Sequence, residues 1–579
     1  MSLRKTSLRR LDGGSFDVLI VGGGINGAVS AAVLAGRGAS VALIDRGDFA
    51  GFTSQESSNL VWGGFKYLEN YSLLLVRKLC MSRNRLTKAY PDNVQPIGFM
   101  ATLDRTSPFP PWLAALGSAA YWGIGNFRTH HPRVLRPRTI KRDEPVINTT
   151  TLRGGIEYFD AYLKDNDARF VFSFIRSAMD VGATAANYVE LTSAVRDGQR
   201  WKVTMRDVDG DAAPMTCTAN IVINAAGPFV DGLNAQWGLQ TEHRIVYSKG
   251  IHLVVPRLTS NERVLAFFDD TQRLFYVIPM GKRSVIGTTD TRVDQPVTHV
   301  TDEDRHFLLQ QINARLSLDV PLTVNDIVSE RCGVRPLVVN SHGGNMDEVD
   351  WTSLSRKHEL EINPAKRVIT IFGGKLTDCL NVGEEVADAV QSLGLPLETD
   401  NHTWYGEPAQ ATRDEFFRQA RLMGLDDLRR KPDVEPLSDR LWRRYGRRAF
   451  QMLDAIRDDP SMGEDIMDSA DYLRVELHVA ARTEMVTKLE DFLRRRSKIS
   501  LVVRDEDIRN SDGLAEVCQI LFGDQANAKL NEYLSSHRSD ASGATSLRDD
   551  RHHPGSVSGP IDPATPQSSP RPQLQPDQI

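Results

Sequence analysis

Cysteines are few in this sequence, and their positions form no pattern. There are five, at positions 80, 217, 332, 379 and 518, an odd number without a C-x-x-C pair. Disulfide frameworks and zinc cages need paired or closely spaced cysteines, so neither class is indicated, and we expect no metal site. Unpaired thiols fit a reducing compartment, and we expect the cytoplasm.

Long apolar runs are also missing. No stretch reaches the roughly 18 consecutive apolar residues of a membrane-spanning helix. Basic residues occur between Arg4 and Arg10, but no apolar segment follows them as in a secretion signal. We therefore expect no integral membrane protein, leave peripheral attachment open, and predict that residues 1–15 form a flexible arm.

Neither sign of charge dominates. With 70 basic and 75 acidic side chains, the net charge of −5 produces no field that would attract nucleic acid. The arginine-rich run at 488–496 has no aromatic stacking platform beside it, so we expect no nucleic-acid partner. Hydrophobic residues make up 41%, an ordinary globular value, and most of the chain is expected to fold.

The spacing of apolar residues divides the chain into regions. Residues 16–44 read as strand, helix and strand, and further apolar strands recur as far as residue 372, which favours an α/β core with an antiparallel sheet domain. From about Pro408 the apolar spacing becomes helical, which predicts a helical domain over 406–535. Residues 536–579 are rich in proline and serine, and we expect them to be disordered.

A glycine-rich turn after the first strand indicates a dinucleotide site. Residues 22–27, GGGING, fit G-x-G-x-x-G in the required strand-to-helix context. Gly22 permits the tight turn, Gly24 admits a diphosphate to the backbone, and Gly27 lets the helix pack on the strand. Asp45, 18 residues beyond Gly27 at the end of the second strand, is placed to accept hydrogen bonds from ribose hydroxyls.

Downstream segments favour FAD over NAD. A hydroxyl-rich stretch at 53–58 suits diphosphate and ribityl oxygens, and two later strands end in the small-residue turns 225–228 and 373–377. We predict that the cofactor contacts Gly22, Gly23, Gly24, Asn26, Gly27, Asp45, Thr53, Ser54, Ser57, Ser58, Ala226, Gly227, Gly373, Gly374, Lys375, Leu376 and Thr377.

Ordered motifs extend this pattern along the chain. They include VGGGINGA at 21–28, SSNLVWGGFKYLE at 57–69, SKGIHLVVPR at 248–257, GVRPL at 333–337 and FGGKLTD at 372–378. With them, residues 16 to about 501 resemble the FAD-dependent glycerol-3-phosphate dehydrogenases, which are flavoproteins of the D-amino-acid-oxidase-like group. The resemblance implies a discontinuous Rossmann-like FAD-binding part within 16–405, an antiparallel-sheet cap at roughly 85–150 and 240–335, and an all-α C-terminal domain.

The resemblance also implies an activity. Glycerol 3-phosphate would be oxidised to dihydroxyacetone phosphate by hydride transfer to the flavin, and the electrons would pass to a membrane quinone. Contact with the cytoplasmic face of a membrane and a homodimer are further expectations. The nearly uncharged stretch 111–124, followed by arginines, could lie in a membrane interface or could be a buried helix.

Residues for three roles can be carried over from the family. The substrate, with its phosphate, is expected to bind Lys66, Tyr67, Arg335, Arg356 and Thr377. The expected catalytic residues are His252 as candidate base, Arg335 for anchoring, and Lys375, whose charge would stabilise the reduced flavin.

Two segments depart from the family pattern. Asn59, Trp62 and Lys66 replace the usual lysine, histidine and arginine, and Asp378, Cys379 and Leu380 replace threonine, tyrosine and arginine. Tryptophan cannot accept a proton, and lysine lacks the planar fork of arginine. A different small hydroxy or amino substrate, or flavin binding without turnover, therefore stays open.

Overall fold

The computed structural model describes residues 2–68, 72–210, 213–341, 357–398, 403–428, 435–467 and 470–541. The chain divides into two units, residues 1–533 and 534–579, and the description below concerns the first of them. Helix α17 (Ala526–Ala541) runs into the second unit, and the rest of the predicted tail lies outside the described residues.

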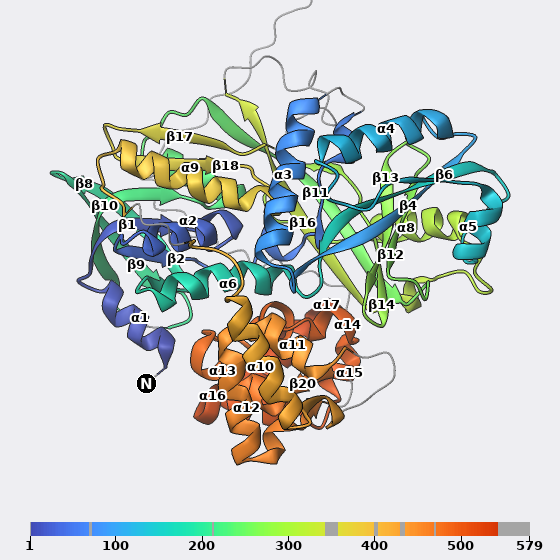
Figure 1. Ribbon diagram of the computed structural model, residues 1–579. Helices are drawn as coiled ribbons and strands as arrows, with labels where there is room; N and C mark the ends of the chain where they lie inside the picture. Colours follow the sequence, from blue (N-terminus) through green and yellow to red (C-terminus); the bar gives the residue numbers. More distant parts are fainter. Residues whose placement is uncertain are drawn as a thin grey trace, which may run out of the picture. The chain divides into compact units, whose positions relative to one another are not determined.

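A mixed, mainly parallel sheet of eight strands forms one side of the first unit (Figure 1), and its edge strand β17 pairs with β18 in the antiparallel direction. Its strand order is β17-β18-β10-β1-β2-β7, and β1 pairs in parallel with both β2 and β10. The strands are β1 (Ser15–Val21), β2 (Val41–Ile44), β7 (Thr184–Ala186), β10 (Met215–Asn224), β17 (Glu359–Asn363) and β18 (Val368–Phe372). The inner strands are largely apolar on both faces because a separate hydrophobic core packs against each face of the sheet. This arrangement confirms the predicted Rossmann-like α/β fold.

Three helices pack together beside this sheet. They are α2 (Ile25–Gly36), α6 (Asp167–Asp180) and α9 (Cys379–Ser392), with α2 in contact with both others. The hairpin of β8 (Val189–Asp197) and β9 (Arg200–Asp207) extends the sheet from β10. One hydrophobic core runs through the three helices and the inner strands.

A second, ten-stranded sheet forms the other side of the unit (Figure 1). Its strands are β3 (Leu60–Val61), β4 (Val94–Asp104), β5 (Arg133–Leu135), β6 (Leu152–Leu163), β11 (His243–Pro256), β12 (Arg263–Phe268), β13 (Leu274–Met280), β14 (Arg283–Gly287), β15 (Thr291–Val293) and β16 (Ser329–Asn340). The second sheet is antiparallel, as predicted, except at one junction, where β4 and β12 pair in parallel. They meet through long-range packing that local patterns do not specify.

Helices α3 (Leu73–Ala89) and α4 (Pro111–Ile124) pack against each other beside the second sheet, while α5 (Pro137–Asp143) contacts β6 and α8 (Asp302–Arg315) contacts β11 and β14. A capping box between Thr301 and Asp304 begins α8. None of the described helices has the length and apolar character needed to cross a membrane.

Residues 1–15 were predicted to form a flexible arm, and this prediction was wrong for the part that forms a helix. Residues Leu3–Leu11 form helix α1, in which Leu11 is fully buried. The Arg4 guanidinium donates to Asp207 at 2.6 Å and to the Asn187 carbonyl at 3.1 Å. One buried leucine and a double polar anchor hold this segment, and neither is visible in local composition.

The C-terminal region is helical, as predicted, and has its own core. Its helices include α10 (Gln410–Leu422), α11 (Leu437–Tyr445), α12 (Ala449–Asp458), α13 (Arg474–Thr483), α14 (Ile499–Val502), α15 (Asp505–Arg509) and α16 (Leu514–Phe522). A short hairpin of β19 (Asp465–Met467) and β20 (Ala470–Leu473) interrupts them, which the expectation of an all-α domain did not include.

Candidate flavin and substrate site

A cleft of about 260 Å³ opens where the central parallel strands end. Parallel sheets bind ligands at the carboxyl ends of their strands, where loops from different strands converge. The cleft is lined by residues 21, 22 and 24–26 at the end of β1, by 45, 46 and 50–54 after β2, by 225–229 after β10 and by 373–374 after β18. Four loops far apart in the sequence therefore meet at one site.

Gly27 and Gly24 of the fingerprint have different surroundings, and each is suited to glycine for its own reason. At Gly27 a Cβ would stand 1.8 Å from the Gly22 carbonyl oxygen, so this position keeps α2 close to β1. Among the described residues, a Cβ at Gly24 would come near only the Ser54 hydroxyl, at 3.2 Å. The space over Gly24 is thus part of the cleft, beside the N-terminus of α2 and its outward-facing N–H groups.

Asp45 lines the cleft and is already held by the backbone. Its carboxylate accepts the N–H of Gly23 at 2.6 Å and of Gly47 at 2.8 Å. Burial raises its pKa to about 6, against the opposing effect of these two hydrogen bonds. At pH 7 the carboxylate is mostly ionised, and each of its oxygens has a further lone pair for a hydroxyl donor.

The hydroxyl-rich stretch separates into two groups. Ser54 accepts the Ile25 N–H at 3.0 Å, and Thr53 donates to the Val334 carbonyl at 2.7 Å; both line the cleft. Ser57 instead donates to the buried Asp167 at 2.7 Å. Neither Ser57 nor Ser58 is among the residues that line the cleft.

The turn after β18 meets the fingerprint helix. Asn26 donates through Nδ2 to the Gly373 carbonyl at 2.9 Å, and its Oδ1 is buried without a hydrogen-bond partner among the described residues. Gly373 and Gly374 have φ of +63° and +107°, which glycine adopts without strain. An unsatisfied buried acceptor beside a backbone cradle fits a bound dinucleotide.

Comparison with known proteins identifies the family. The FAD dependent oxidoreductase family matches residues 17–373, and the C-terminal domain of alpha-glycerophosphate oxidase matches 429–527. The chain belongs to the FAD-dependent oxidoreductases.

Relatives extend the match over most of the chain. "Glycerol-3-phosphate dehydrogenase 2" of Mycobacterium tuberculosis is 31% identical over 530 residues, covering 90% of this chain and 87% of the relative. "Aerobic glycerol-3-phosphate dehydrogenase" of Escherichia coli is 30% identical, covering 87% and 98%. The structure of a glycerol-3-phosphate dehydrogenase from Bacillus halodurans complexed with FAD shares the fold, with a TM-score of 0.69, 23% identity and coverage of 92% and 96%.

Three cleft residues of this FAD-dependent oxidoreductase were missed from the sequence. The Arg46 guanidinium lies 3.9 Å from the Phe229 ring centroid and 5.2 Å from that of Phe52. The two rings meet edge to face at 5.2 Å, and all three residues line the cleft. Arginine directly after Asp45 was the only local signal, because the aromatic residues lie far apart in the chain.

The side chain of Arg335, on β16, crosses the neighbouring strand β11 at Gly250, where no side chain occupies the space. On the neighbouring strand, a Cβ at Gly250 would be 2.0 Å from the Arg335 Nη2 atom. The guanidinium donates to the Thr288 hydroxyl at 2.6 Å and the Thr289 carbonyl at 3.1 Å, and contacts Asp290 at 3.4 Å. The glycine of the KGIH motif thereby gives the arginine its position.

Lys375 and Tyr67, 308 positions apart, lie together. The lysine donates to the tyrosine hydroxyl at 2.7 Å, with its nitrogen 4.2 Å from the ring centroid. Lys66 is half-buried beside Tyr67 on the short helix η2 (Phe65–Leu68), Thr377 is buried on η6 (Leu376–Asp378), and Leu376 contributes to the same turn. Arg356 lies outside the described residues.

His252 is enclosed in the second sheet. It is 2% exposed, and neither ring nitrogen has a hydrogen-bond partner among the described residues. Burial, and then the charges of Arg331 and Arg335, hold its pKa well below the usual value. The imidazole is therefore neutral, and it does not line the flavin cleft. Its role as a base stays a prediction.

Two of the departures from the family pattern have structural explanations. Asn59 adopts φ of +59°, which asparagine tolerates, and donates to the Asp165 carbonyl at 2.6 Å. Asp378 accepts a hydrogen bond from Ser82 at 2.7 Å and lies 3.1 Å from His358 Nδ1. The new anion is therefore compensated within a local cluster rather than added to the substrate site.

The His358 cluster predicts a pH dependence of stability. Burial alone would lower the pKa of His358, but its contacts with Asp378 and with Glu385, at 2.7 Å, raise it overall. A raised pKa in the folded state stabilises the protein fully below the unfolded value of about 6.5, and this stability is lost as pH rises through the folded pKa. We expect the free energy of unfolding to fall by up to ~1.4 kcal/mol per pH unit there.

Denaturant titrations between pH 6 and 9 measure this slope. In the His358→Gln variant the slope over this interval is expected to flatten, while His306→Gln, on the exposed side of α8, should keep it. An unchanged slope in His358→Gln would contradict the assignment.

Proposed function

We propose that this FAD-dependent oxidoreductase oxidises sn-glycerol 3-phosphate to dihydroxyacetone phosphate. The proposal rests mainly on the two glycerol-3-phosphate dehydrogenases that match at least 87% of the chain at about 30% identity. Arg46 lines the cleft, and Lys375 and Arg335 directly follow and precede the lining residues Gly374 and Pro336 in the chain. These cations support the proposal, because phosphate recognition needs charge-assisted donors. Bound FAD supplies the hydride acceptor.

The residues divide the remaining work. Arg335 is proposed to hold the substrate phosphate, because the hydrogen bonds that its guanidinium donates to Thr288 and Thr289 fix its position. Lys375, oriented by Tyr67, is proposed to place positive charge by the flavin ring and the substrate oxygens. Neutral His252 is the candidate acceptor of the hydroxyl proton.

Anaerobic flavin spectroscopy tests the function directly. The purified protein is expected to be yellow, and addition of glycerol 3-phosphate without oxygen should bleach the flavin absorbance. Glycerol serves as the control without phosphate. Bleaching by another hydroxy or amino compound, with none by glycerol 3-phosphate, would favour the alternative substrate; no bleaching by any of them would favour flavin binding without turnover.

Loss of the Arg335 guanidinium should weaken turnover of glycerol 3-phosphate strongly. Arg335 is half-buried. Removing one partner of a desolvated charge-assisted contact costs about 2–5 kcal/mol, so Arg335→Gln is expected to lower kcat/KM by roughly 30- to 5000-fold. Steady-state kinetics measures the loss. Arg153→Gln, which removes an exposed arginine of β6, is the matched control and should retain nearly full activity. Equal activity of the two variants would remove Arg335 from the site.

We further propose that the protein docks on the cytoplasmic face of a membrane and passes electrons to a quinone. One face of α4 is buried through Ala114 and Tyr121, while Trp112 and Leu116 on the other are 69% and 63% exposed. On the neighbouring helix α3, Leu74 is 86% exposed. Exposed apolar side chains on adjoining helices suit insertion at a lipid interface. Dimerisation stays a prediction.

Vesicle binding tests the docking proposal. Trp112→Ser/Leu116→Ser is expected to reduce co-sedimentation with anionic phospholipid vesicles roughly tenfold or more, because two large apolar groups are lost from the interface. Leu422→Ser, at an exposed leucine of α10, is the control and should bind like the parent. Reoxidation of the reduced flavin by a short-chain ubiquinone tests the acceptor. Equal vesicle binding by all variants would exclude α4 as the docking helix.

A further inference from the structure

A second cavity, of about 730 Å³, lies away from the flavin cleft. It is bounded by α2 and α6 of the FAD-binding part, by the segment 403–408, and by residues 442–448 of the C-terminal region. Its volume is in the range of sites for small organic ligands. None of its lining residues lines the flavin cleft, although α2 reaches both.

The lining carries more positive than negative charge. It contains six arginines and four carboxylates: Arg169, Arg176, Arg443, Arg444, Arg447 and Arg448, with Asp165, Asp180, Glu407 and Glu484. Unbalanced charge at a partly enclosed site is unfavourable unless a counter-ion neutralises it. The composition therefore indicates an anion.

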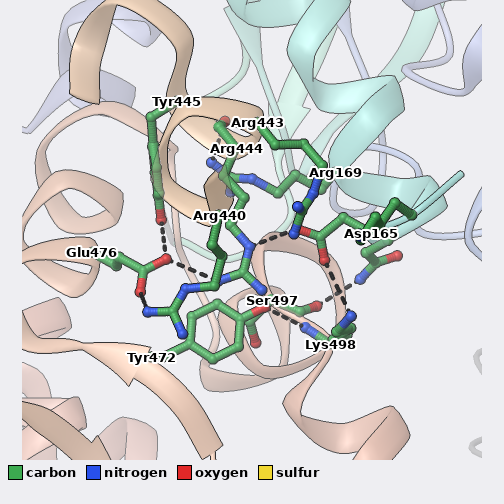
Figure 2. A network of polar contacts seen from close by, with 12 residues as sticks. Asp165, Arg169, Arg440, Arg443, Arg444, Tyr445, Tyr472, Glu476, Ser497 and Lys498 are labelled. Atoms are coloured by element: carbon green, nitrogen blue, oxygen red, sulfur yellow. Dashed lines mark hydrogen bonds and ion pairs between the residues drawn. The ribbon is translucent and has the colours of Figure 1, made fainter. Parts of the chain in front are cut away.

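The deeper arginines are already neutralised within the protein (Figure 2). Arg444 contacts Asp165 at 2.5 Å and Glu476 at 2.9 Å, and Tyr445 points its hydroxyl at the same Glu476, 3.2 Å away. Arg169 contacts Glu484 at 3.0 Å. Arg444 and Arg169 are therefore held by ion pairs within the protein, and their charges are already compensated.

The surplus lies with three other arginines. Arg176 and Arg448 share the single carboxylate of Asp180, at 2.7 and 2.6 Å. Burial, and then the charge of Arg176, lower the pKa of Arg448. Arg447 is exposed, and in the described part of the chain its side chain has no ion pair or hydrogen bond. These three guanidinium groups carry three positive charges, and the Asp180 carboxylate supplies one negative charge.

Aromatic rings provide the apolar part of the same cavity. The lining includes Tyr90, Phe170, Trp404, Tyr405, Trp442 and Tyr445. We infer that this cavity is a binding site for a small phosphate monoester with an aromatic or apolar body, whose phosphate is held by Arg176, Arg447 and Arg448. Guanidinium groups match phosphate oxygens in geometry as well as in charge, and the rings cover the rest of the ligand.

Calorimetric titration of the FAD-loaded full chain tests the inference, with phenyl phosphate as the probe. The parent protein is expected to bind phenyl phosphate and to bind phenol much more weakly. Arg447→Gln/Arg448→Gln should weaken phenyl phosphate binding at least about tenfold, since charge-assisted bonds are lost. Arg421→Gln, an exposed arginine of α10 outside the cavity, is the matched control and should bind like the parent.

Two further variants keep the test decisive. Arg447→Gln alone removes no contact that holds the described structure together, so its weaker binding supports the site even where the double variant is unstable. Arg335→Gln should retain this binding, because it alters only the proposed substrate site. Loss of phenyl phosphate binding in Arg335→Gln, or equal binding in the Arg447 variants and the parent, would overturn the inference.

Discussion

Replacing Gly24 by alanine is expected to give a folded protein that has lost most of its affinity for FAD. Within the described ranges the added Cβ would meet only the Ser54 hydroxyl, at 3.2 Å, and a small rotation of that side chain can accommodate it. It would nevertheless stand in the cleft beside the N-terminus of α2, where a diphosphate needs direct access to backbone N–H groups. We expect the affinity to fall at least about 100-fold, near 3 kcal/mol.

Flavin fluorescence titration of the apoprotein measures the affinity, and circular dichroism reports folding. Gly117→Ala, at a helix position of α4 with open space around it, is the control and should bind FAD normally. Gly27→Ala should differ from both by damaging the fold itself, since its Cβ would collide with the Gly22 carbonyl. If Gly24→Ala binds FAD like the parent, the diphosphate does not bind at this turn.

Replacing Asp48 by asparagine should destabilise the whole protein. Asp48 is buried on the loop after β2 and pairs with two buried arginines of the C-terminal region, with Arg495 at 2.6 Å and with Arg496 at 2.8 Å. Burial opposes its ionisation, but the two arginines lower its pKa overall. Removing one side of a buried ion pair costs about 3–5 kcal/mol, because the other charge is left without compensation.

Denaturant unfolding of Asp48→Asn measures this loss. Asp454→Asn removes a comparable ion pair at the surface, with Arg457 at 2.8 Å, and is expected to cost less than about 1 kcal/mol. Because the pKa of Asp48 is lowered, its contribution is present above the unfolded value of about 3.9 and is lost as pH falls through the folded value. Equal stability of the two variants would show that the buried contact is not required.

The glycine turns that line the cleft were predictable from the sequence, because their backbone conformation requires glycine. The turn 22–27 and the glycines at 373–374 can be recognised in the sequence, because their positive φ angles and the close packing of backbone on backbone favour glycine. Asp45 follows from its position at the end of β2. Ser57 is outside the cleft lining and donates to the buried Asp167, and the sequence cannot distinguish a hydroxyl that faces a cofactor from one that faces a buried carboxylate.

Residues brought in by tertiary packing could not be found in this way. Phe229 reaches Arg46 only because β10 and β2 end at the same edge of the sheet. Burial of the arginine run 494–496 could not be predicted, since two of its acidic partners, Asp48 and Glu56, lie more than 430 positions earlier. Helix α1 was missed for the same reason, because Asp207 anchors it from far along the chain.

The contacts of the arginine run have a consequence for biosynthesis. The loop 48–56 is clamped by Arg494, Arg495 and Arg496, so the segment that carries Thr53 and Ser54 lacks its final support until residue 496 has emerged from the ribosome. Domains generally fold in the order of synthesis. Here the loop 48–56, near the N-terminus, is stabilised only after the helical segment Asp491–Arg496 has been synthesised. Nascent chains released before this point are expected to capture flavin poorly, which makes cofactor loading a late step in maturation.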